Sequence, residues 1–120
     1  MTKKDITNST DIEFLVRSFY ERAVADPKLS AHFAHVDFEA HFPRMIAFWD
    51  FLLLDKMGFQ GNVFDAHRNL NVDKTDFDCW LSHFHATVDA YFEGEKATLA
   101  KQKADSIAVI FYSKLQQLKL

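Results

Sequence analysis

A chain of 120 residues with a formal net charge of −3 is long enough for one domain with a real core and too short for a second catalytic unit. The balance of 48% hydrophobic and 26% charged residues is globular, and the slight negative charge gives no electrostatic reason to expect nucleic acid or an anionic membrane as a partner. Glycine occurs only 3 times and proline only 2 times, so few helix breakers are present and helices are expected rather than many short strands.

The chain carries no sign of export or of a membrane span. The first residues, MTKKDITNSTD, lack the apolar core of a signal peptide, and the longest aliphatic run, residues 51–54, is far too short to cross a bilayer. The single cysteine, Cys79, excludes an internal disulfide and a cysteine-based zinc site, and it is typical of a reducing compartment. These features predict a cytoplasmic protein.

The first predicted helix runs from about residue 10 to residue 25. Residues 1–8 are polar and are expected to form a flexible N-terminus, followed by one domain over residues 9–120. Thr10 and Glu13 have the spacing of a capping box. The apolar positions keep a period of 3.6 residues, with Tyr20 in the buried stripe or at its edge, so its hydroxyl needs a partner if it is covered.

Two helices are predicted between residues 26 and 56. Asp26-Pro27 supplies a cap and a first helical residue for a short helix, and Asp37 caps a long helix with Pro43 early in it. His41, at the head of the long helix's apolar face, is expected on its own to be a boundary residue. Arg44, three positions further on, is placed to meet an anionic group at the rim of the site that His41 faces. The members of this face are His41, Met45, Phe48, Trp49 and Leu52.

Two further helices complete an all-α prediction with three long helices and several short ones. The first begins at Asp73, or at Thr75 with Asp78, and Gly94 ends it. Its apolar face consists of Phe77, Trp80, Leu81, Phe84, Val88 and Tyr91. The last helix spans about residues 95–118 and buries Ala100, Ala104, Ile107, Ala108, Phe111 and Leu115.

Residues 59–80 are the stretch around which the chain is expected to be organised. His67 lies at its centre on a short helical turn, between the turn-forming Gly61-Asn62 and the polar residues 69–76. A histidine on such a segment packs poorly in a core, but its imidazole can be directed at a metal. Haem iron is the best candidate, because a single proximal histidine can hold it.

The spacing of the six histidines argues against other metal sites. No histidine has an acidic residue three positions before it, as a di-iron bundle requires, and there is no His-Glu-x-x-His motif. His83 and His85 point to different sides of a helix, so they do not form a chelate. His32 and His35 are expected to lie at the surface. Cys79 is expected to face a neighbouring helix and to be unreactive. Only His67 and His41 have contexts that suggest a site.

A series of segments from about residue 11 to residue 115 keeps a characteristic order and spacing. The segments are residues 15–20, 26–27 with Phe33, 41–45 leading to 48–49, 59–62, His67, and 77–84. Together they resemble the truncated haemoglobins, specifically group III, and the scarcity of glycine fits because groups I and II use Gly-Gly turns. Asp76 departs from the commonest pattern, in which histidine precedes the Phe77 position.

The resemblance implies a truncated globin, a two-over-two helical sandwich around haem b, acting as a monomer. His67 would be the proximal iron ligand, Tyr20 and Trp80 the hydrogen-bond donors on the ligand side, and His41 the distal histidine. Arg44 resembles a partner of the haem propionates, with Arg68 and Lys74 as weaker candidates. The implied cofactor-binding set is Phe33, His41, Arg44, Met45, Phe48, Trp49, His67, Arg68 and Trp80.

The implied function is reversible binding of O2, and of other diatomics such as NO or CO, as in oxygen transport. A neutral donor in a dry pocket stabilises a ligand with partial negative charge by ~1–3 kcal/mol, so two donors would slow its release by roughly one to three orders of magnitude. Two alternatives stay open. One is a haem enzyme that detoxifies nitric oxide or peroxide with electrons from an external reductase; the other is a haem-free helical interaction module.

Overall fold

The structure, a computed structural model, describes residues 3–34, 36–56 and 72–118. The elements in these ranges are α1 (Ser9–Ala25), α2 (Pro27–Ser30), the 3-10 helix η1 (Ala31–Phe33), α3 (Phe38–Leu54), α5 (Lys74–Tyr91) and α6 (Glu95–Leu118). The all-α prediction is confirmed, with four long helices in the described ranges instead of three. His67 and Arg68 lie outside the described residues. None of the described helices is long and apolar enough to cross a membrane.

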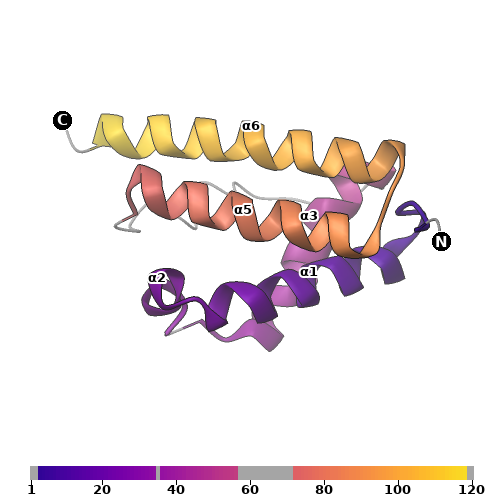
Figure 1. The fold of residues 1–120 in the computed structure, drawn as a ribbon, viewed down its shortest axis with the longest axis horizontal. Helices are drawn as coiled ribbons and strands as arrows, with labels where there is room; N and C mark the ends of the chain where they lie inside the picture. Colours follow the sequence, from indigo (N-terminus) through magenta and orange to yellow (C-terminus); the bar gives the residue numbers. More distant parts are fainter. Residues whose placement is uncertain (1–2, 35, 57–71, 119–120) are drawn as a thin grey trace.

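Two pairs of helices are stacked across one another (Figure 1). Helices α5 and α6 run side by side in opposite directions, and α1 packs on α3. The pairs meet where α1 contacts α5 and where α3 contacts α6. This is the predicted two-over-two arrangement.

Aspartates cap three of the helices. Asp26 and Asp37 cap α2 and α3, as predicted. Of the two starts considered for α5, Asp73 is the cap: its carboxylate accepts the Asp76 N–H at 2.8 Å, and the Asp76 carboxylate accepts the Asp73 N–H at 3.1 Å. This reciprocal capping box explains the acidic residue at position 76.

The start of α1 differs from the prediction. Its N-cap is Asn8, whose side chain accepts the Asp11 N–H at 2.9 Å. Thr10 therefore lies inside the helix, and Glu13 forms an ion pair one turn further along instead of closing a capping box. Asparagine is at least as strong an N-cap as threonine, which accounts for the earlier start.

Residues 4–6 are part of the fold, in contrast to the flexible N-terminus expected over residues 1–8. The Ile6 side chain is only 1% exposed and belongs to the main core. The Asp5 carboxylate accepts the backbone N–H groups of Lys96 and Ala97, both at 2.9 Å, and so satisfies the start of α6. Burial alone would raise the pKa of Asp5, but these hydrogen bonds lower it below its usual value.

Gly94 forms the turn between α5 and α6 against which Asp5 rests. Its φ of 134° is in a region that other residues rarely adopt, and a Cβ there would lie 2.6 Å from the Asp5 Cγ. Glycine is thus required by both the backbone conformation and the close approach. Helix α5 itself ends before Gly94, at Tyr91.

One face of α6 is a row of alanines. All four members are less than 5% exposed, and their spacing of three and four residues places them on one side of the helix. They are Ala97, Ala100, Ala104 and Ala108. Because alanine has no side chain beyond Cβ, α6 can pack closely on its neighbours.

Truncating Ile6 tests the role of the N-terminal segment. We expect Ile6→Ala to lower the free energy of unfolding by about 2–5 kcal/mol, because it removes buried methyl groups and leaves a cavity. Val109→Ala is the matched control, since Val109 is 65% exposed and its truncation is expected to change stability by at most about 0.5 kcal/mol. Urea unfolding measures both, and equal stabilities would contradict a structural role for the segment.

Candidate functional site

A cavity of ≈ 350 Å³ opens between the two helix pairs. Its walls come from α1, α2, η1, α3, α5 and α6, and they are mainly aromatic and aliphatic. A volume of this size, lined by apolar surface with a few polar groups, is typical of a small-molecule site.

Every described residue of the implied cofactor-binding and ligand-stabilising sets lines this cavity. These residues are Tyr20, Phe33, His41, Arg44, Met45, Phe48, Trp49 and Trp80. The weaker candidate Lys74 is not among the lining residues, and its ammonium lies 3.1 Å from the Asp78 carboxylate. The individual roles assigned to the lining residues remain predictions.

Tyr20 brings a hydroxyl into an aromatic wall. Its ring packs against Phe33, Phe38 and Phe42, with centroid distances of 5.6, 5.3 and 6.2 Å. Burial raises the pKa of Tyr20 to about 12, so the hydroxyl keeps its proton at neutral pH. No described residue forms a hydrogen bond with this hydroxyl, which leaves it able to donate to a molecule in the cavity.

Trp80 supplies a second donor from the opposite helix pair. Its indole stacks on Phe84 at 5.7 Å and meets the Phe19 ring edge-on at 5.5 Å, which holds its orientation. Within the described part of the chain the indole N–H has no hydrogen-bond partner. An indole N–H can only donate, so Trp80 can contribute one hydrogen bond to a ligand.

His41 and Arg44 are the exposed members of the lining on α3. They are three positions apart and therefore neighbours on the helix surface. Arg44 has no ion-pair partner among the residues described. Its guanidinium is available to an anionic group at the edge of the cavity.

The cavity also contains an acidic group that sequence reasoning did not assign to the site. The Asp76 carboxylate lies 3.1 Å from the Lys28 Nζ and 3.4 Å from the His32 Nε2. Burial alone would raise the pKa of Asp76, but hydrogen bonds from the Asp73 N–H and Lys28 lower it. His32 was expected at the surface, and its 3-10 helix η1, of three residues, is too short for periodicity to show which side it faces. The other lining residues missed as site residues are Leu29, Val36, Phe38, Val72, Phe77, Ile107, Ala108 and Phe111.

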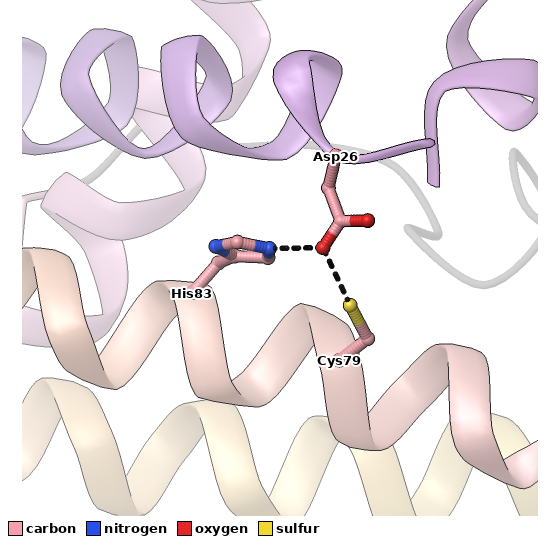
Figure 2. A group of neighbouring side chains, drawn as sticks. All are labelled: Asp26, Cys79 and His83. Carbon is pink, nitrogen blue, oxygen red and sulfur yellow. Dashed lines mark hydrogen bonds and ion pairs between the residues drawn. The ribbon is translucent and has the colours of Figure 1, made fainter. Parts of the chain in front are cut away.

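A second cluster joins α5 to the α1–α2 junction (Figure 2). The Asp26 Oδ2 lies 2.7 Å from the His83 Nε2 and accepts a hydrogen bond from the Cys79 Sγ at 3.1 Å. The His83 and Cys79 hydrogen bonds lower the pKa of Asp26 to about 2. Burial, followed by the Asp26 carboxylate, raises the pKa of Cys79, which favours the unreactive thiol that was expected. The sequence analysis did not group His83 with Cys79 and Asp26, because Asp26 is far from both along the chain.

A solved structure shares this architecture over nearly its whole length. It is the crystal structure of a group III truncated hemoglobin from Campylobacter jejuni, with a TM-score of 0.82 and 25% sequence identity over 95% of each chain. The fold is that of a truncated haemoglobin. The resemblance derived from the sequence is therefore confirmed, although neither a protein-family model nor a curated protein matches the globin's sequence.

The cavity of this globin fits the haem that its fold implies. Flat aromatic walls suit a planar apolar ring, and the exposed Arg44 suits the carboxylates at the edge of such a ring. Tyr20 and Trp80 add two donors that lack partners among the described residues. The lining thus suits a flat cofactor, with two neutral donors left over.

The second cluster gives the globin a testable pH dependence of stability. The pKa of Asp26 falls from 3.8 to about 2 on folding, so its stabilising effect is complete above pH 3.8 and is lost as the pH falls through about 2. Asparagine keeps the helix cap but cannot ionise. We therefore expect the stability advantage of the wild type over Asp26→Asn to shrink as the pH falls from about 4 to about 2. Urea unfolding over that range checks this, and a constant difference would contradict it.

Proposed function

We propose that this globin binds haem b in the cavity and uses it to bind a diatomic ligand such as O2, NO or CO reversibly. The observation that carries the proposal is the convergence of the predicted site residues of α1, η1, α3 and α5 on one cavity of a truncated-haemoglobin fold. Similarity of fold alone would not require these side chains to share a cavity. The proposal also places the globin in the cytoplasm, as a monomer.

The residues of the cavity suit distinct tasks in holding haem. Phe33, Phe48 and Trp49 provide apolar surface for the ring, and Arg44 provides a cation for its propionates. His67 is proposed as the iron ligand from the sequence, because it lies outside the described residues. When bound, haem supplies an iron centre that binds diatomic molecules.

Tyr20 and Trp80 are proposed to stabilise the ligand. Each offers one hydrogen bond in a mainly apolar cavity, where a donor contributes about 1–3 kcal/mol to holding a partly negative ligand. His41 is proposed as a third polar group on the same side. Because it is exposed on α3, it is placed to meet a ligand near the opening.

A second candidate function follows from the same two donors. Two hydrogen bonds to one ligand slow its release, which suits a protein that converts the ligand more than one that delivers it. The activity would then be nitric oxide dioxygenation or peroxide reduction, with electrons supplied by a reductase.

Absorption spectroscopy tests the proposed cofactor. We expect a Soret band that shifts on reduction with dithionite and again on addition of CO. The absence of a band, even after haem is added back, would leave a haem-free helical module. In His67→Ala we expect haem to be lost or held five-coordinate through a substitute ligand, and an unchanged spectrum would contradict the proximal assignment.

Ligand release tests the proposed donors and separates the two functions. We expect Tyr20→Phe and Trp80→Phe each to accelerate O2 release at least about fivefold, which corresponds to the loss of ~1 kcal/mol. Tyr91→Phe is the matched control, because the 42% exposed Tyr91 is not among the cavity-lining residues. Unchanged rates in both pocket variants would rule out the donor assignment. Rapid release from the wild type favours ligand delivery, whereas very slow release with fast reaction toward nitric oxide favours the enzyme.

A further inference from the structure

We propose that Asp26, Cys79 and His83 form a second metal site, one that takes a divalent transition-metal ion and is best matched to Zn²⁺. The three side chains offer one oxygen, one sulfur and one nitrogen, and these atoms all lie within 4.8 Å of one another. Carboxylate, thiolate and imidazole are the three side-chain ligands of zinc in proteins. The proposal is independent of the proposed haem chemistry, since none of the three residues lines the cavity.

Two of the three separations between the ligand atoms are close to those around a bound ion. Zinc bonds of about 2.0–2.3 Å at tetrahedral angles place neighbouring ligand atoms about 3.4–3.6 Å apart. The Asp26 Oδ2 now lies 2.7 Å from the His83 Nε2 and 3.1 Å from the Cys79 Sγ. These two separations must grow by about 0.5–0.7 Å to match those bond lengths. The third separation, between the His83 Nε2 and the Cys79 Sγ, is within 4.8 Å.

The backbone holds the three ligands in place. Cys79 and His83 are four residues apart on α5 and therefore lie on one face of the helix (Figure 2). Asp26 is fixed at the α1–α2 junction, where its other carboxylate oxygen accepts the Lys28 N–H at 2.9 Å. The chelate would thus use one oxygen for the metal and keep the other as the helix cap.

Exposure and charge both suit an ion that enters from solvent. The side chains of His83 and Asp26 are 26% and 24% exposed, so the cluster is accessible but partly shielded. On binding, the Cys79 thiol releases its proton to solvent and becomes a thiolate, while the His83 imidazole binds in its neutral form. One carboxylate and one thiolate then balance the two positive charges, and water completes the fourth position.

Zinc binding to the full-length, haem-loaded protein tests the site. Equilibrium dialysis with metal analysis is expected to show one Zn²⁺ per chain. Loss of a hydrogen-bond partner to a ligand costs about 10–100-fold in metal affinity, so loss of a ligand itself in Cys79→Ser or His83→Gln should cost at least about 100-fold. His85→Gln is the matched control: His85 also lies on α5 and is also 2.8 Å from an aspartate, Asp105, yet it is outside the cluster.

Alkylation gives a readout that does not depend on the variants folding. Cys79 is the single cysteine of the chain, so mass spectrometry after iodoacetamide treatment reports on it alone. Zn²⁺ is expected to slow this alkylation in the wild type. Absence of zinc binding, equal binding in all variants, or alkylation that is unaffected by zinc would each overturn the proposal and leave the cluster as a hydrogen-bonded joint. The Soret band is recorded on the same samples, so failure of the haem proposal is visible separately.

Discussion

The ring of Phe84 lies where α1, α3 and α5 meet, and both indoles of the cavity wall rest on it. Phe84 is 1% exposed, with Trp49 stacked at 5.0 Å, Trp80 stacked at 5.7 Å and Phe19 edge-on at 5.4 Å. Close-packed interiors resist the movement of such rings. The wall of the cavity is therefore an extension of the core, and the donor on Trp80 is held by packing rather than by a hydrogen bond within the described chain.

The polar groups at the cavity are of two kinds: a carboxylate with nearby partners, and neutral donors without partners among the described residues. Lys28 and His32 both lie next to the Asp76 carboxylate at one side of the cavity, and Asp76 is engaged further in the cap of α5. Tyr20 and Trp80 have no such partners among the described residues, and the apolar rings around them strengthen any hydrogen bond that they make. The cavity thus contains both a paired carboxylate and neutral donors that lack partners among the described residues.

Local patterns were sufficient to predict most of the fold. Asp26, Asp37 and Asp73 mark helix starts through short-range capping, and the apolar periods between them identify the buried faces. The α1 start was misplaced because Thr10 and Glu13 match the capping-box spacing, whereas Asn8, two residues earlier, provides the cap. The candidate site residues were predicted from the order of whole segments, since no single segment is specific.

Contacts between distant parts of the chain could not be predicted in this way. Asp5 caps a helix that starts about 90 residues later, and Cys79 meets a carboxylate 53 positions away. Ile6 is one apolar residue within a polar run, which has no periodicity to show that it is buried. In each case the partner is brought close only by the packing of complete helices, and sequence spacing along one helix contains no information about it.

The alanine row on α6 makes this side of the cavity harder to deform than the side formed by α2 and η1. Ala108 is both a member of this row and a lining residue, and an alanine has no rotamer with which to open or close space. The opposite boundary is formed by α2 and η1, two short described elements in which Leu29 is the one buried residue. A ligand that needs more room than the resting cavity provides would therefore displace α2 and η1 more easily than the alanine face of α6.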